Sequence, residues 1–178
     1  MTDLEQLDDI REIFNSEGLL LVVKYALPDV MAFLLNTRGL EQAEQDLRDI
    51  GHTIAERMLI IWQPESGNPI KVLKEIKKKF FKKTKQIKAK ILERFGGAPS
   101  KILIRDKDCP VCPEEKGEEL KISEIHYCTS ISAFVETILN WLIEHNRTTY
   151  TAATCKTIAS VGSGHDACEM IIDLKYRG

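Results

Sequence analysis

The spacing of apolar residues divides the chain into a helical first half and a second half of short strands. Up to residue 97 the apolar positions recur every three or four residues, which is typical of amphipathic helices. Gly18, Pro64 and the pair Gly96-Gly97 interrupt this pattern, so we expect helices to end there. The predicted helices run from Leu4 to Gly18, from Pro28 to about Leu35, from Gly39 to Ile61 and from Pro69 to Phe95.

After residue 97 the apolar residues alternate with polar ones, as strands require. Hydroxyl side chains at 129–132, which are suited to cap a helix, precede an apolar stripe that ends at Leu142. The predicted order is ββαββ, with strands at Lys101–Arg105, Leu120–Ile125, Thr148–Val161 and Cys168–Leu174. We therefore predict an α+β fold in which a helical region, 1–97, packs on a mostly antiparallel sheet within 98–178. The two regions are expected to form one compact unit.

Composition and charge argue against several classes of protein function. The chain has 178 residues, of which 43% are apolar and 29% charged, a balance typical of globular proteins. Its net charge of −2 does not indicate a protein that binds nucleic acid. The most apolar run, Leu19–Leu35, contains Lys24, Pro28 and Asp29, so no segment is predicted to span a membrane. The acidic N-terminus is unlike a signal peptide, so we expect a cytoplasmic protein.

The predicted helix 69–95 is strongly basic. It holds eleven lysine or arginine residues and two glutamates, so its net charge is +9. A basic amphipathic helix can contact an anionic membrane surface or phosphates. The alternative is a core helix whose outer face is solvated lysine, and this is the interpretation we favour, because no aromatic side chains alternate with the lysines.

Five cysteines, all in the second half, are the most informative chemical feature. An odd number without a secretion signal argues against disulfides. The spacing Cys109-x2-Cys112 is that of a zinc knuckle, and structural zinc takes four thiolate or imidazole ligands. Free cysteines are also often small buried hydrophobic residues, so the residues alone leave metal binding and plain packing open. The remaining candidate ligands are Cys128, Cys155, Cys168, His126 and His165.

The turn between the last two predicted strands bears on both metal binding and catalysis. A hairpin around Gly162–Gly164 would bring Cys155 and Cys168 near one another, with an offset that a β-bulge could absorb. Ser163, His165 and Asp166 are the residue types of a hydrolase triad, but neighbours in one turn cannot form that relay. The glycines lack the surrounding βαβ unit of a dinucleotide site. Catalysis is therefore uncertain and not favoured.

Four features of the second half occur in a known order: Cys109-Pro110-Val111-Cys112 after a strand, Cys128 opening a helix, Cys155 in the next strand, and Cys168 after a glycine turn. In this respect the chain from about Ser100 onward resembles the 4-vinyl-reductase domain, a small-molecule-binding module. The resemblance implies a structural zinc ion held by four of the five cysteines. Ala152 stands where the family has a glutamate ligand, so Cys109 or Cys112 is expected to replace it, with His165 as the next choice.

The same resemblance implies a pocket between the sheet and the helix for a hydrophobic molecule, aromatic or lipid-like. Its expected lining residues are Phe134, Ile138, Trp141 and Tyr150. The chain would then be a sensor or a carrier. The fold superfamily also includes small subunits of vesicle-tethering complexes, so a protein-assembly scaffold is the alternative. An enzyme that uses cysteine or zinc is a third interpretation.

A homodimer is also predicted. The dense apolar stretch Leu19–Leu35 is one reason. The other is the predicted helix 69–95, which would be about 40 Å long at roughly 1.5 Å per residue. Such a rod is longer than a compact domain of this size needs, so part of its apolar stripe would pack on a second copy.

Overall fold

The computed structural model describes residues 26, 29–80, 87–107, 109, 111–112 and 125–177. Residues 29–38 are helical. The labelled elements that follow are α2 (Leu40–Ile61), α3 (Pro69–Phe80), β1 (Lys88–Phe95), β2 (Ala98–Asp106), α4 (Thr129–Glu144), β3 (Tyr150–Ala159), the 3₁₀ turn η2 (Val161–Ser163) and β4 (Cys168–Tyr176). The predicted helix from Leu4 to Gly18 lies outside the described residues.

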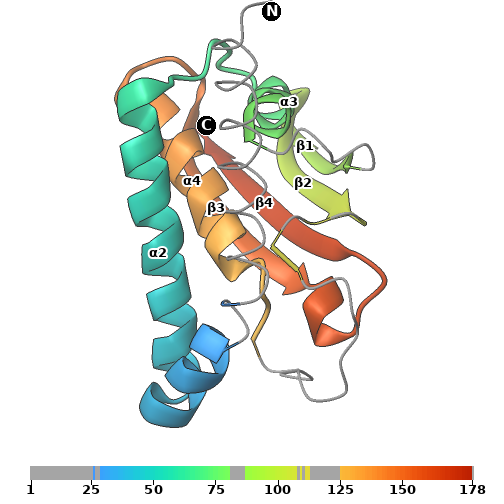
Figure 1. Cartoon of the computed structure of the whole chain (residues 1–178). Coiled ribbons are helices and arrows are strands. Elements are labelled where there is room, and N and C mark those ends of the chain that lie inside the picture. Colours follow the sequence, from blue (N-terminus) through green and yellow to red (C-terminus); the bar gives the residue numbers. More distant parts are fainter. Residues whose placement is uncertain are drawn as a thin grey trace, which may run out of the picture.

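The four strands form one antiparallel sheet in the order β1-β2-β4-β3. Helix α4 packs along the sheet beside β3, and α2 packs on the outer side of α4 (Figure 1). Buried side chains of all these layers form an aliphatic core, which includes Ile102, Ile138, Leu139, Leu142 and Ile172. The predicted α+β fold with a helical first half and an antiparallel sheet is confirmed.

The predicted long helix 69–95 is wrong. Helix α3 spans only Pro69–Phe80, and Lys88–Phe95 form strand β1, which pairs with β2. The reason lies in Gly96 and Gly97, which have φ values of 55° and 84°. Two consecutive positive φ angles make the tight turn of a two-residue β-hairpin, a conformation that glycine adopts without strain. The glycine pair therefore joins two strands and does not end a helix.

The order ββαββ is present, but its first two strands lie earlier than predicted. They are 88–95 and 98–106, and the turn of their hairpin falls at the expected division between 1–97 and 98–178. Most of the predicted strand 120–125 lies outside the described residues, and Ile125 is a buried residue outside any strand. Among the residues that the structure describes, no helix has the length and apolar character needed to cross a membrane.

The outer edge of β3 is covered by side chains from the helices. Asn140 of α4 accepts a hydrogen bond from the backbone N–H of Ala153 at 3.1 Å and donates one to its carbonyl oxygen at 3.0 Å. Two residues along, the Cys155 N–H donates to Glu136 at 2.6 Å, and Arg48 donates to the Cys155 carbonyl at 3.1 Å. Arg48 and Glu136 also form an ion pair at 2.8 Å. The backbone groups of Ala153 and Cys155 on this edge are therefore satisfied without another strand.

Candidate metal centre

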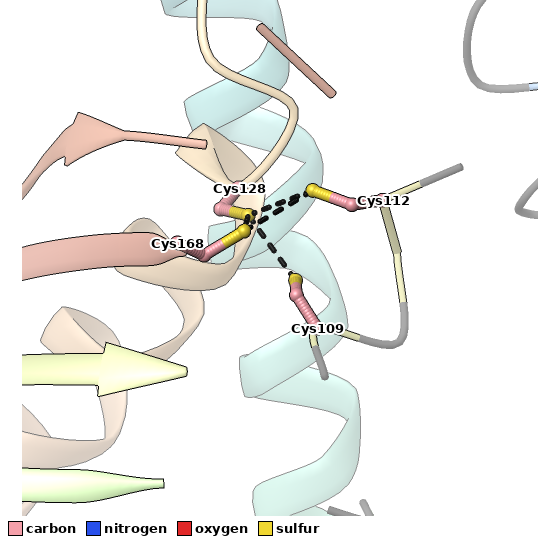
Figure 2. Close-up of side chains that lie close together, drawn as sticks. All are labelled: Cys109, Cys112, Cys128 and Cys168. Carbon is pink, nitrogen blue, oxygen red and sulfur yellow. Dashed lines mark hydrogen bonds between the residues drawn. The ribbon is translucent and has the colours of Figure 1, made fainter. Parts of the chain in front are cut away.

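Four cysteines from three separate parts of the chain converge at one end of the sheet. Cys109 and Cys112 follow β2, Cys128 directly precedes α4, and Cys168 is the first residue of β4. Figure 2 shows the four sulfurs pointing toward one another. All four Sγ atoms lie within 4.8 Å of one another. We call these four residues the cysteine cluster.

The spacing of the sulfurs suits a tetrahedral metal ion. The distances from Cys128 Sγ to the Cys168, Cys109 and Cys112 sulfurs are 3.0, 3.2 and 3.4 Å, and the Cys112 and Cys168 sulfurs are 3.2 Å apart. Zinc–sulfur bonds of about 2.3 Å in a tetrahedron place sulfurs about 3.8 Å apart. The four separations above are shorter than that value, and every pair of sulfurs lies within 4.8 Å, so the sulfurs need to move by less than about 1 Å to form a four-thiolate site.

The cluster is buried, and its protons are shared. Cys112, Cys128 and Cys168 are 3–6% exposed, and Cys109 is half-buried. The pKa of the Cys112 thiol is lowered because the three other thiols, Cys109 first, donate hydrogen bonds to its sulfur. The pKa of Cys128 is raised by its hydrogen bonds to the other thiols, Cys109 first, and by burial. Hydrogen bonds among the four thiols therefore lower the pKa of one of them, and the thiolate is the form that binds metal.

Backbone amides of the η2 turn also face the sulfurs. The Val161 N–H donates a hydrogen bond to Cys168 Sγ at 3.4 Å, and the backbone of Gly162 lowers the pKa of Cys112 by hydrogen bonding. A Cβ at Gly162 would overlap the ring of Tyr127, so glycine lets the turn pack closely against that ring. Ser163 Oγ anchors the same turn by donating to the Ile125 carbonyl oxygen at 3.0 Å. Amide donors of this kind stabilise thiolates and hold metal ligands in position.

Local hydrogen bonds place the remaining ligand positions. The Cys112 N–H donates to the Cys109 carbonyl oxygen at 3.3 Å, which closes the turn between the two cysteines. Cys128 occupies the N-cap position of α4, where its carbonyl oxygen accepts hydrogen bonds from the Ser132 N–H and from Thr157 Oγ1, both at 3.0 Å. Cys168 starts β4 opposite Asp106 of β2. Each thiol therefore sits where an ordered element begins or a tight turn closes.

Cys155 and His165 do not join the cluster. Cys155 pairs with Ile172 in the β3–β4 ladder, four residues along β4 from Cys168, so the expectation that a bulge would bring Cys155 to Cys168 is wrong. Its thiol is buried in the aliphatic core, and burial raises its pKa. His165 is exposed, and its ring faces that of His126 with centroids 5.9 Å apart.

The four residues expected to line a ligand pocket do not surround one cavity in the part of the chain that the structure describes. Phe134 and Ile138 are buried in the aliphatic core. Tyr150 is buried in the same core, edge-on to Tyr176 with ring centroids 6.3 Å apart, and burial raises its pKa to about 12. Trp141 lies in a surface groove between α2 and α4, where its ring stacks on His145 at 4.1 Å.

An apolar cavity does lie on another side of α4, against the cysteine cluster. Its volume is about 60 Å³, several times what one water molecule needs, and its walls are almost entirely apolar. Sequence reasoning missed it because its walls come from four elements, α3, β2, α4 and β4, and from residues between elements. The one available signal was the pair Ile131 and Val135, which lie one turn apart on the apolar stripe of α4. The cavity is lined by Leu73, Ile76, Ile87, Ile104, Asp106, Cys109, Cys128, Ile131, Val135, Cys168, Glu169 and Met170.

Comparison with known proteins identifies the fold. No family model matches the chain, and no curated protein matches it. Among solved structures, a trafficking protein particle complex subunit 3 from Naegleria fowleri, covalently bound to palmitic acid, matches with a TM-score of 0.63 and 16% identity, over 93% of this chain and 99% of that one. The phenol-responsive sensory domain of the transcription activator PoxR, with phenol, has a TM-score of 0.47 and 15% identity, over 85% and 74% of the two chains. The chain therefore shares its fold with this trafficking-complex subunit, which fits the expected relation to tethering-complex subunits.

Proposed function

We propose that this chain is a small-molecule-binding module in which a structural zinc ion supports a site for a single aliphatic chain. One observation carries the proposal: three sulfurs of a four-cysteine cluster belong to residues that line an apolar cavity. The module acts as a sensor or a carrier in the cytoplasm, where free thiols stay reduced. This role also fits membership of the 4-vinyl-reductase family.

Zinc is the metal that this donor set suits best. Four thiolates in a tetrahedron select zinc over magnesium or calcium, which prefer oxygen ligands. The ion would join the segment Cys109–Cys112 to the start of α4 and the start of β4. Binding of the ion would therefore add directly to the stability of this end of the fold.

The cavity walls favour an alkyl chain over an aromatic ring. Seven of the lining residues are aliphatic or methionine, and none of the described lining residues is aromatic. The polar lining consists of the carboxylates Asp106 and Glu169, which would repel a carboxylate headgroup. A cavity of about 60 Å³ holds only the end of such a chain, so a fatty acid would insert its terminal carbons and leave the rest of its chain and its head outside the cavity. The palmitic acid bound to the structurally similar trafficking subunit supports a chain of this kind.

Native mass spectrometry of the purified protein tests this function. We expect one zinc ion per chain and a saturable increase in mass with dodecanoic acid. Phenol, which tests the aromatic alternative, is expected to bind more weakly. Protein that carries no zinc after purification without chelator, or that binds neither compound, would contradict the proposal. Chemical conversion of either compound would indicate an enzyme.

Assembly with another protein is the second candidate function. The outer face of α2 exposes Ile50, Ile54 and Ile61 by 41%, 48% and 78%, and Phe33 in the preceding helical segment is 64% exposed. Exposed apolar residues in such a group are typical of protein interfaces. The homodimer prediction now rests on the apolar N-terminal stretch alone, because α3 has 12 residues and is no long rod. Sedimentation equilibrium of the wild type and Ile54→Lys tests whether this face joins two copies.

A further inference from the structure

We infer that the metal ion and the aliphatic ligand bind cooperatively, because the metal site forms part of the ligand's cavity wall. The inference rests on the proposed function and adds the way in which that site is regulated. It predicts that zinc raises the affinity for the aliphatic chain, and that the chain in turn raises the affinity for zinc.

The first step is the shared wall. Cys109, Cys128 and Cys168 belong both to the cysteine cluster and to the lining of the cavity. Next to them in the lining stand Ile131 and Val135 of α4 and Met170 of β4, so an alkyl chain in the cavity would contact aliphatic groups and sulfurs together. Any displacement of these sulfurs changes the shape of the ligand site.

The second step concerns which part of the wall depends on the metal. Cys128 and Cys168 are held by the ends of α4 and β4. Cys109 belongs to neither a helix nor a strand; its contacts include the other three thiols, among them Cys128 Sγ at 3.2 Å, and a turn closed by the Cys112 N–H. A metal ion would bind Cys109 and Cys112 together with Cys128 and Cys168. It would thereby attach the segment that carries Cys109 to the starts of α4 and β4. The wall would then be preformed before the ligand arrives.

The third step gives the sign of the coupling. A ligand that enters a preformed cavity does not have to order the wall itself, so its binding costs less conformational entropy. Coupling between two binding equilibria is reciprocal, and its usual size is about 5–150-fold in affinity. Zinc and the aliphatic chain should therefore each raise the affinity for the other by at least about fivefold.

The test uses dodecanoic acid as the probe and measures both directions. Isothermal titration calorimetry measures the dissociation constant of dodecanoic acid for zinc-loaded and for metal-free protein. Circular dichroism verifies that the metal-free protein is folded. Competition with a chromophoric chelator then measures zinc affinity with and without dodecanoic acid. Ile131→Phe narrows the cavity and should abolish the effect of the acid on zinc affinity. Ile143→Phe alters a half-buried residue of the same helix outside the cavity lining and should preserve it.

The outcomes separate the inference from the function on which it rests. Failure of zinc-loaded protein to bind dodecanoic acid would overturn the proposed function. Binding that is equal within twofold in both metal states, with unchanged zinc affinity, would overturn the coupling alone. If metal-free protein is unfolded, cobalt replaces zinc, and the sulfur-to-cobalt absorption bands are recorded as dodecanoic acid is added. A spectral change that Ile143→Phe retains and Ile131→Phe loses supports the inference, and an unchanged spectrum overturns it.

Discussion

The interior of this molecule has two parts that are stabilised in different ways. The aliphatic core between α4 and the sheet consists of hydrocarbon side chains, such as Leu139 and Ile172, that are completely buried. The second part surrounds the cysteine cluster, where Met31, Leu47 and Tyr127 are buried in one group with Cys112, Cys128 and Cys168. Burial of hydrocarbon stabilises the first part without any metal ion and without any change of charge. The second part gathers ionisable thiols in a buried place, so its stability should depend on what neutralises them.

The largest expected effect is the loss of a cluster cysteine. Cys128 touches all three other sulfurs, so Cys128→Ser should abolish stoichiometric zinc binding and lower stability by about 3 kcal/mol or more, roughly 6–12 °C in Tm. Elemental analysis and thermal denaturation measure both effects. Cys155→Ser is the matched control: it also alters a buried thiol, but outside the cluster, and should leave one zinc ion bound. Equal zinc content in the two variants would remove the distinction between the two parts of the interior.

Leu139→Ala addresses the aliphatic core. Leu139 is 0% exposed, and its truncation should cost about 2–5 kcal/mol of unfolding free energy through lost burial and a cavity. Because the core lies apart from the sulfurs, the same loss is expected in zinc-loaded and metal-free protein, as measured by urea denaturation. A loss that occurs only with zinc bound would show that the two parts unfold as one metal-dependent unit.

The η2 turn offers a finer test of the cysteine part. Val161→Pro removes the amide that faces Cys168 Sγ, and Ser160 before it is already extended, with φ −142° and ψ 147°, as a residue before proline must be. We expect about a 10–100-fold loss of zinc affinity in chelator competition. Val161→Ala keeps the N–H and should retain near-normal affinity. If both variants lose affinity equally, the side chain and not the amide matters.

The smallest effect is expected at the edge of β3. Asn140→Leu removes both hydrogen bonds to Ala153, which should cost about 1–2 kcal/mol, independent of zinc. Asn140→Asp keeps the acceptor for the Ala153 N–H and loses the donor, so its cost should be intermediate. Urea denaturation ranks the wild type and the two variants by their free energy of unfolding. If Asn140→Leu is as stable as the wild type, water bonds to the backbone groups of Ala153 as well as the Asn140 side chain does.

Sequence patterns predicted the fold class well because the stripe on α4 and the alternation in β2 and β4 are local signals. They failed at 87–95, where Ile87 and Ile91 are four residues apart and so fit a helix, and where lysines also favour one. The Gly96-Gly97 pair is compatible with a helix stop and with a hairpin, and only the pairing of β1 with β2 decides. That pairing joins the two sides of the glycine turn, and the helical spacing of the apolar residues before the turn does not reveal it.

The sequence predicted the type of metal ligand in the candidate site, but not which cysteines form it. The knuckle spacing and the number of cysteines indicated thiolate ligands, yet the sequence could not exclude Cys155. Its position depends on the register of β3 with β4, in which Cys155 lies opposite Ile172. The cavity was even harder to predict from the sequence, because residues from α3, β2, α4 and β4 meet only in the folded chain.

The closed edge of β3 has a consequence for how this protein behaves when concentrated. A free strand edge is a template on which another chain can add, the first step of edge-to-edge aggregation. Asn140, Glu136 and Arg48 occupy the positions that an incoming strand would need at Ala153 and Cys155. The helices thus take the place of a neighbouring strand at these two residues, so another chain cannot pair along the middle of β3 without displacing them.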